Sequence, residues 1–230
     1  AADRYKLDDR ELALTISSHS GEPGHVETAR GILAKAGRDE TCLECGVHWP
    51  MSREAERALA ASGQKPSTLH NNCSGKHSGF VCLACGMDDD PKNYIKPDHL
   101  VQDEWTGIDG CSIPTYAVPL RNLALAFAKF GTGKGLAPKR AEAAQRLRNA
   151  AAAHPFMVAG TGRLDTEAMT VLGSKLFMKT GAEGVYCAAL PSEGLGLAVK
   201  VDDGEVRAAQ AVLAGLVHRL LPMTDLERQK

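Results

Sequence analysis

The sequence predicts an α+β (α/β) fold in which helices pack against a mainly antiparallel sheet. Segments with helical periodicity outnumber segments with strand character along the 230 residues. The two clearest strand segments, 184–191 and 195–203, are separated only by a short turn, so we expect them to pair as a hairpin. The segment that follows, 205–221, has apolar residues on one helical face, which we expect to cover that hairpin.

Upstream of the hairpin, five further helices are expected. Residues 24–37 have apolar side chains at helical spacing and end at Gly37. Residues 52–62 begin with Ser52, a favourable N-cap residue, and carry acidic side chains in the first turn. The other three are an apolar helix over 116–130 that Pro119 interrupts early, an alanine-rich helix over 138–153, and a helix over 166–180.

The composition is typical of a globular protein and argues against two classes of partner. Hydrophobic residues make up 43% of the chain and charged residues 24%. The net charge of −1 gives no electrostatic basis for binding nucleic acid or an acidic membrane surface. No apolar run approaches the ~20 residues that span a bilayer. We therefore expect no nucleic acid and no membrane as partners.

Seven cysteines, an odd number, argue against a disulfide framework and predict a reducing, cytoplasmic compartment. Four of them form two CxxC pairs, Cys42/Cys45 and Cys82/Cys85. Paired CxxC motifs can bind zinc, but these two lie in apolar surroundings without turn residues inside them. We interpret the four as buried free thiols that pack as small apolar groups.

Glycine-rich loops that mix glycine with reactive side chains interrupt the regular segments five times. Functional groups gather on loops that a scaffold holds in place, so five such loops suggest one shared site. The loops are ISSHSGEPGH (16–25), HNNCSGKHSG (70–79), GIDGCSIPTY (107–116), VAGTGRLDT (158–166) and KTGAEGVY (179–186).

Two of these loops carry a cysteine in a glycine–serine turn, Cys73 and Cys111. A thiolate in such a turn near positive charge is suited to be a metal ligand or a nucleophile. Lys76 follows Cys73 by three residues, but a lysine binds zinc only when it is neutral, so residue type alone favours His77 as the next ligand. The alternative is a polar turn without a metal.

A serine and a lysine are the second candidates for chemistry. Ser18 lies beside His19, directly after a strand-like segment, where a serine can act as a nucleophile if a base is within reach. Alternatively, this serine cluster caps the following helix. Lys179 is either a solvated surface charge or a desolvated base paired with a serine.

Six segments of the chain together resemble the signature segments of the asparaginase II family, the Rhizobium-type L-asparaginases. They match in order, from about residue 3 to about residue 220: SSHSGEPGHVE, LECGVHWP, HNNCSGKHSGF, GIDGCSIPTYAVPL, HPFMVAGTGRLDT and KTGAEGVYCAALP. The resemblance implies hydrolysis of L-asparagine to L-aspartate and ammonia by a homodimer. It also implies a fold related to the serine β-lactamases, with an antiparallel sheet packed by helices.

The same resemblance implies roles for individual residues. Ser18 and Lys179 would form a catalytic Ser–Lys pair, and Asp109 would contact water or the amino group of the substrate. Three residues would hold a zinc ion (Zn2+): Cys73, Lys76 and Cys111. Three more would line the substrate pocket: His77, Arg163 and Asn72.

The chain also departs from the family pattern. The family carries a second Ser–Lys pair in a Ser-x-x-Lys helix near its N-terminus, and we expect that segment to be missing here. The run before GIDGC is also shorter than in relatives. We therefore predict a single asparaginase II-type catalytic domain over residues 1–230 that lacks an N-terminal segment and some loop residues.

Two alternatives to asparagine hydrolysis stay open. One is a related hydrolase on the same fold that acts on glutamine, another amide or a β-lactam. The other is a zinc-stabilised amino-acid-binding protein without turnover. Which serine attacks the substrate also stays open, because Ser18 is suited either to attack or to relay protons.

Overall fold

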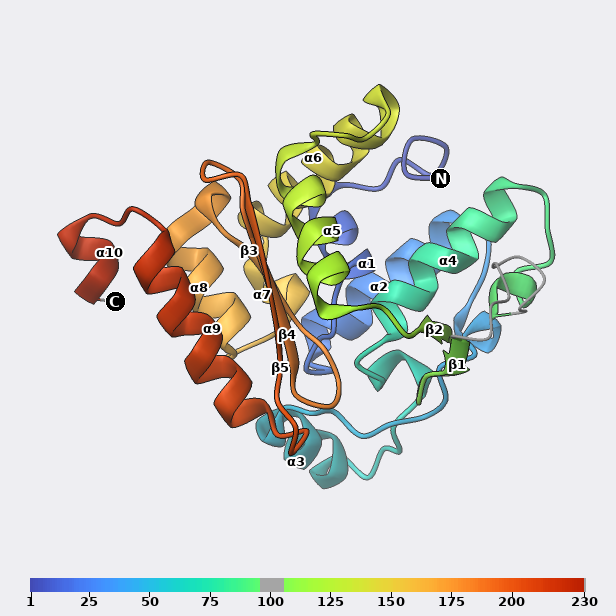
Figure 1. The fold of residues 1–230 in the computed structure, drawn as a ribbon. Helices are drawn as coiled ribbons and strands as arrows, with labels where there is room; N and C mark the ends of the chain where they lie inside the picture. Colours follow the sequence, from blue (N-terminus) through green and yellow to red (C-terminus); the bar gives the residue numbers. More distant parts are fainter. Residues whose placement is uncertain (96–105, 230) are drawn as a thin grey trace. The chain divides into compact units, whose positions relative to one another are not determined.

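The computed structural model describes residues 1–95 and 106–229, and its contacts divide the chain into two compact units (Figure 1). The first unit comprises Ala1–Ala117 and Phe156–Thr161, and the second Val118–Pro155 and Gly162–Lys230. Helices and small antiparallel sheets make up the fold, so the predicted α+β class is confirmed. The single catalytic domain stays a prediction. Within the described part of the chain, no helix is both long enough and apolar enough to cross a membrane.

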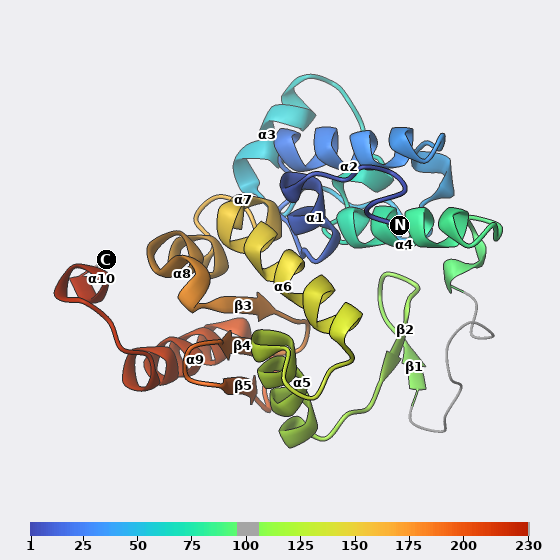
Figure 2. The ribbon, with the colours of Figure 1, turned by 90° about the horizontal axis from the view of Figure 1, so that it is seen from above.

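The first unit is built on three helices that pack pairwise: α1 (Asp9–Thr15), α2 (Pro23–Lys35) and α4 (Ser74–Gly86). Figure 2 shows α2 and α4 running side by side. Their facing side chains form a core in which Leu14, Ile32 and Val81 are fully buried. The remaining elements are short: η1 (Glu40–Cys42), α3 (Arg53–Ala61), η2 (Thr68–His70), η3 (Asn93–Ile95), β1 (Thr106–Ile108) and β2 (Pro114–Tyr116).

The second unit is built on a three-stranded antiparallel sheet in the order β3-β4-β5. The strands are β3 (Phe177–Thr180), β4 (Val185–Leu190) and β5 (Leu195–Lys200). Helices α5 (Leu120–Thr132) and α9 (Val206–Leu220) both pack on β4 and β5, and Figure 1 shows them on opposite sides of the sheet. Consistent with this, five consecutive residues of β4, from Tyr186 to Leu190, are buried.

Four further helical elements complete the second unit: α6 (Pro138–Ala153), α8 (Leu164–Leu172), η5 (Gly173–Lys175) and α10 (Asp225–Gln229). Helix α7 (Pro155–Val158) spans the boundary between the units. Because α8 packs on β3 and leads into it through η5, the chain between Arg163 and Thr180 forms a compact helix–strand turn.

Most predicted elements are confirmed. The hairpin of β4 and β5, its covering helix α9, and helices α2, α3 and α6 all lie where the sequence places them. Ser52 caps α3, accepting a hydrogen bond from Ala55 N. The 116–130 helix begins later than predicted, at Leu120, because Pro119 starts it and Tyr116 pairs in β2.

Three predictions about regular structure are wrong. The segment before Ser18, expected to be strand-like, is the end of helix α1, which Asp8 and Glu11 cap at its start. The 166–180 segment is helical only to Leu172, since Gly173 adopts a positive φ of 54° and the following residues pair with β4 as a strand. The loop 70–79 is helical from Ser74 onward, so Lys76 and His77 lie in the first turn of α4. Pairing with β4 makes the later segment a strand, and packing against α1 and α2 accompanies the helix over the 70–79 loop.

Gly75 allows α4 to begin against α1 without a clash. A Cβ atom at this position would lie 2.4 Å from Leu14 O and 3.0 Å from Ser17 Oγ. We expect Gly75→Ala to destabilise the protein by about 3 kcal/mol, because overpacking of this kind forces backbone to move. Urea unfolding followed by circular dichroism measures this.

Gly31→Ala is the matched control, because its added Cβ would meet only Glu11 Oε1 at 3.8 Å, which is an ordinary contact. Gly31 lies inside α2 of the same unit, so this change should be neutral or stabilise by up to about 1 kcal/mol. Equal stability of the two variants would contradict the proposed close approach of α4 to α1.

Candidate active site

A cluster of two thiols and an amine forms in the first unit. Cys73 is the N-cap residue of α4, Lys76 lies in the first turn of that helix, and Cys111 lies in the turn between β1 and β2. Lys76 Nζ lies 3.4 Å from Cys111 Sγ, and the Cys73 thiol hydrogen-bonds to the Cys111 sulfur. The fold therefore brings together the three residues for which zinc binding was expected.

Local hydrogen bonds hold both turns of this cluster. Asn71 Oδ1 accepts a hydrogen bond from Cys73 N at 2.9 Å, while Asn71 Nδ2 donates to Cys45 O at 2.7 Å. In the other turn, Asp109 N donates to Ile113 O at 2.8 Å and Ser112 N donates to Asp109 O at 2.9 Å. These bonds place the two sulfur-bearing residues independently of any side-chain contact between them.

The contacts within the cluster shift the pKa values of its two cysteines in opposite directions. The hydrogen bond from Cys73 lowers the pKa of the Cys111 thiol despite burial, with help from His77 and Lys76. The same hydrogen bond raises the pKa of Cys73. Burial disfavours the charge of Lys76, but the neighbouring Cys73 and Cys111 sulfurs outweigh it and raise the pKa of Lys76. These contacts therefore favour negative charge on the Cys111 sulfur and positive charge on Lys76.

Asp109 and His77 flank this cluster. Asp109 is exposed, and its Oδ2 lies 3.7 Å from Cys111 Sγ. His77 is fully buried, with Nδ1 2.7 Å from the Tyr94 hydroxyl, which in turn accepts a hydrogen bond from Glu44 N at 2.8 Å. The hydroxyl proton of Tyr94 is thus free to bond to His77 Nδ1, which leaves the ring proton on Nε2.

His77 Nε2 is the unsatisfied atom of this arrangement. It is buried and has no hydrogen-bond partner of normal geometry among the described residues. The His77 ring also contributes to lowering the pKa of the Cys111 thiol. Tyr94 was missed by sequence reasoning, and nothing in its local sequence indicates a partner 17 residues away.

Ser18 and Asn72 connect the loop over residues 16–25, called the serine loop below, to the start of helix α4. Asn72 Nδ2 donates to Ser18 Oγ at 2.9 Å, and the backbone N–H of His19 donates to Asn72 O at 3.0 Å. Asn72 directly precedes Cys73, so the residue that bonds to the Ser18 hydroxyl is adjacent in the chain to a residue of the thiol–amine cluster. Ser18 N also donates to Val158 O at 3.0 Å, which fixes the loop to the 158–161 segment.

His19 is not placed to act as the base for Ser18. It is fully buried, its Nδ1 accepts a hydrogen bond from Gly21 N at 3.1 Å, and its Nε2 lies 3.0 Å from Ser74 Oγ. Since Nδ1 is the acceptor, the proton on Nε2 bonds to Ser74, whose own hydroxyl donates to Leu69 O. This histidine braces the serine loop against α4, a role that sequence reasoning missed.

The serine loop is also tied to the 158–161 segment at Gly160. Ser20 Oγ donates to Ala159 O at 2.9 Å, and Glu22 accepts hydrogen bonds from Thr161 N and Thr161 Oγ1. Gly160 has a φ of 120°, and a Cβ there would lie 2.6 Å from both Ser20 Oγ and Glu22 Oε1. Only glycine therefore fits at position 160 while Ser20 and Glu22 keep their contacts with the 158–161 segment.

In the second unit, Lys179 lies on β3 and is half-buried. Its Nζ donates to Thr180 O at 2.7 Å, and it pairs across the sheet with Cys187. Buried Asp165 holds the end of this strand, accepting hydrogen bonds from Thr180 N at 3.0 Å and from the Tyr186 hydroxyl at 2.5 Å. Sequence reasoning missed Asp165, which reads locally as an ordinary acidic residue in the first turn of a helix.

Arg163 is the N-cap residue of α8, two residues before Asp165. Its positive charge is one of the groups that act on buried Tyr186, whose pKa is raised mainly by burial and by the neighbouring Asp165 carboxylate. Arg163 therefore lies two residues before Asp165, and Lys179 lies directly before Thr180, whose N–H donates to Asp165. Ser18 and Asn72 belong to the first unit, so the Ser18–Lys179 pair stays a prediction.

The chain does contain one Ser-x-x-Lys sequence, Ser62–Lys65, but it is not a helical pair. Ser62 caps the C-terminal end of α3 and donates its hydroxyl to Leu59 O, and Gly63 then adopts a positive φ of 71°. Helix geometry is lost before Lys65 is reached, and all four residues are exposed. Ser62 and Lys65 therefore do not lie on one face of a helix, as the two residues of a helical Ser-x-x-Lys pair do.

The CxxC cysteines make separate contacts. Cys45 Sγ donates to Thr68 O and Cys82 Sγ to Ile32 O, each at 3.7 Å. Burial raises the pKa of Cys45 to about 12 and that of Cys82 to about 11, so both are thiols at neutral pH. Throughout residues 1–95 and 106–229, no three His, Cys, Asp or Glu side chains are arranged to hold a metal ion.

Comparison with known proteins gives one result for the chain as a whole. No curated protein matches it. The sequence model of the family described as L-asparaginase II matches residues 1–230, which is the full printed sequence. A match over the entire length confirms the resemblance drawn from the six motifs, and the chain belongs to the L-asparaginase II family.

Proposed function

We propose that this protein hydrolyses L-asparagine to L-aspartate and ammonia by Ser–Lys catalysis beside a bound zinc ion. Membership of the L-asparaginase II family supports asparagine hydrolysis in general. The observation that carries the finer proposal is the start of α4. There Asn72 holds the Ser18 hydroxyl while the next residue, Cys73, belongs to the thiol–amine cluster.

The reaction begins when Ser18 Oγ attacks the side-chain amide carbon of asparagine. Lys179 takes the serine proton and passes it to the departing nitrogen, which leaves as ammonia while an ester forms with the serine. Water then cleaves that ester and releases aspartate. Lys179 can serve as the base only if its amine is neutral near pH 7, which requires a pKa about 3 units below the usual ~10.4. Burial or a neighbouring cation produces such a shift.

Asn72 positions the nucleophile in this proposal. Its Nδ2 donates to Ser18 Oγ at 2.9 Å, so the serine lone pair that accepts this bond is fixed in direction. Asp109, exposed beside the cluster, is assigned to the amino group of the substrate or to the attacking water. Arg163 is assigned to the substrate carboxylate, for which its planar guanidinium is suited. His77, which is fully buried, is assigned to the wall of the substrate pocket.

The donor set of Cys73, Lys76 and Cys111 fits zinc. Two thiolates and a neutral amine are ligands that zinc accepts, and three protein ligands leave a fourth position open. Nitrogen and sulfur ligands on one tetrahedral zinc lie about 3.6 Å apart, and Lys76 Nζ lies 3.4 Å from Cys111 Sγ. To hold the ion, Cys73 and Lys76 would have to be deprotonated, so zinc affinity would fall at low pH. When bound, the ion would supply a positive charge that organises the site and anchors polar groups of the substrate.

We further propose that the protein acts in the cytoplasm as a homodimer. Free thiols at all seven cysteines are consistent with a reducing compartment. Light scattering of the purified protein tests the dimer, with a mass near twice 24.4 kDa expected.

Ammonia release from asparagine and glutamine, together with the colour change of a chromogenic β-lactam, tests the proposed activity. We expect kcat/KM for asparagine to exceed that for glutamine by at least roughly tenfold, because one extra methylene displaces the amide from the catalytic serine. A chromogenic β-lactam should give no turnover. Preferential turnover of glutamine or of the lactam would instead identify a related hydrolase, and saturable asparagine binding without ammonia release would identify a sensor.

A further inference from the structure

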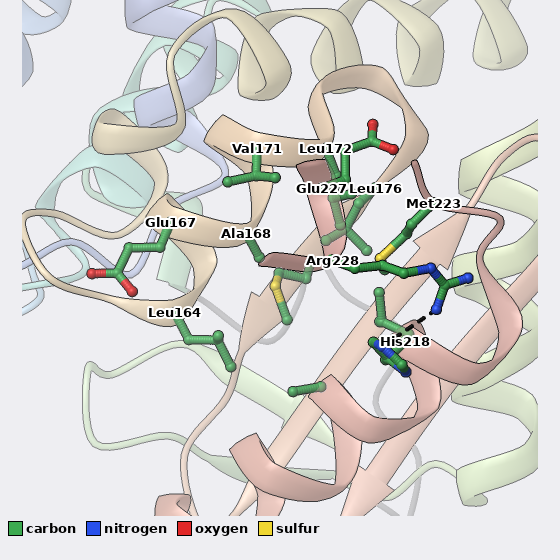
Figure 3. Close-up of a pocket in the computed structure, with 13 residues that line it drawn as sticks. Leu164, Glu167, Ala168, Val171, Leu172, Leu176, His218, Met223, Glu227 and Arg228 are labelled. Carbon is green, nitrogen blue, oxygen red and sulfur yellow. Dashed lines mark hydrogen bonds between the residues drawn. The ribbon is translucent and has the colours of Figure 1, made fainter. Parts of the chain in front are cut away.

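The second unit contains a cavity of about 200 Å³ between α8, α9 and the chain around α10 (Figure 3). Aliphatic and methionine side chains make up most of its wall, among them Leu164, Val171, Leu176, Met178, Val217 and Met223. None of the nine residues assigned to asparagine hydrolysis lines it. It is therefore a separate concave site whose chemistry is mainly apolar.

One end of this cavity carries a positive charge. Arg228 Nη1 donates to His218 Nε2 at 3.3 Å, and Arg228 makes no ion pair with any residue that the structure describes. Glu227 also lines the cavity, but Lys175 Nζ contacts both of its carboxylate oxygens, at 2.7 and 3.0 Å, and compensates its charge. Figure 3 shows Glu167 at the opposite end from Arg228 and His218.

We propose that this cavity binds a small organic monocarboxylate whose apolar body is one aromatic ring or a short aliphatic chain. The carboxylate lies at Arg228 and His218, since a guanidinium offers two parallel donors to a carboxylate. The apolar body lies among the aliphatic side chains, where its transfer from water is favourable.

The size of the cavity limits the ligand. An apolar cavity of about 150 Å³ holds a benzene molecule, whereas sites for drug-sized ligands begin at about 300 Å³. A volume of about 200 Å³ therefore fits a single ring with a one- or two-atom arm. Asparagine does not fit this chemistry, because its ammonium and amide groups would lose water against an apolar wall.

Methyl NMR of methionine-labelled protein, titrated with phenylacetate, tests this inference. Met178 and Met223 line the cavity, whereas Met51 and Met87 are exposed in the first unit and report non-specific binding. We expect saturable shifts of the Met178 and Met223 signals and none of the Met51 and Met87 signals. Unsaturable shifts, or equal shifts of all four signals, would overturn the proposal.

Two variants and a matched probe test the charge and the location. Arg228→Gln removes the cation of an exposed side chain and should weaken phenylacetate binding by roughly tenfold. Ala214→Trp adds a large side chain to the cavity wall and should abolish binding. Phenethylamine, which has the same ring with a cationic arm, should bind at least roughly tenfold more weakly than phenylacetate.

Three outcomes contradict the proposal. Phenethylamine binding as tightly as phenylacetate would show that Arg228 does not select the anion. Unchanged binding by Ala214→Trp would place the ligand elsewhere. Shifts of Met178 and Met223 that follow protein concentration without any probe would show that a second copy of the chain occupies the cavity.

Discussion

Replacing Ser18 with alanine is expected to lower kcat/KM for asparagine at least a hundredfold. The variant lacks the oxygen that forms the ester with substrate, so only direct attack by water remains. Stability should change little, because Ser18 Oγ accepts one hydrogen bond, from Asn72, and the side chain is only half-buried. Ammonia release at saturating and limiting asparagine, in the full-length protein, separates an effect on kcat from an effect on KM.

Ser62→Ala is the matched control for this experiment. Ser62 belongs to the chain's one Ser-x-x-Lys sequence, but its exposed hydroxyl is bonded to Leu59 O at the end of α3. This variant should keep the rate of the unmodified protein. Near-normal ammonia release by Ser18→Ala would remove Ser18 from the mechanism, and a large loss in Ser62→Ala would move the nucleophile to the end of α3.

The elements that the sequence predicted well are those whose signals are local. Helix α6 begins at Pro138 and continues through an alanine-rich run to Ala153, as predicted, because proline favours the first turn and alanine the interior. The hairpin of β4 and β5 follows from apolar strands on either side of a short turn. Strand β3 was missed because four residues carry little pattern, and only their pairing with β4 makes them a strand.

The candidate site was predicted in part for a different reason. Glycine-rich motifs marked the loops, and the family resemblance named the thiol and lysine residues that the fold brings together in the first unit. The reason for a glycine at a given position could not be predicted from the sequence of its own loop. Gly160 matters because Ser20 and Glu22 occupy the space where its side chain would be, and these lie about 140 residues away in sequence.

The residues that support the site could not be predicted from local sequence. Asp165 bonds to Thr180 N and the Tyr186 hydroxyl, and His19 to Ser74, across separations of 15, 21 and 55 residues. Each residue type is common in loops and helix starts, so no pattern distinguishes it. Burial decides their roles, because a buried polar group that lacks a partner is costly.

Cys111→Ser is expected to remove the bound zinc. A serine hydroxyl remains protonated at neutral pH and is a weak ligand, so the site would retain only Cys73 and Lys76. Loss of one of three protein ligands should lower zinc affinity by roughly a hundredfold or more. Inductively coupled plasma mass spectrometry of protein purified without added chelator should therefore fall from about one zinc per chain to nearly none. Cys73→Ser should behave alike.

Two further variants distinguish this cluster from other thiols. Cys85→Ser changes a half-buried thiol on α4 that lies outside the cluster and belongs to a CxxC pair, so it should retain full zinc. Lys76→Met keeps the length of the side chain but has no amine, so it should lose zinc if the amine is a ligand. Full zinc in Cys111→Ser together with loss in Cys85→Ser would transfer the metal to the CxxC cysteines. Zinc retained by Lys76→Met but not by Cys111→Ser would leave the thiolates as ligands and exclude the lysine.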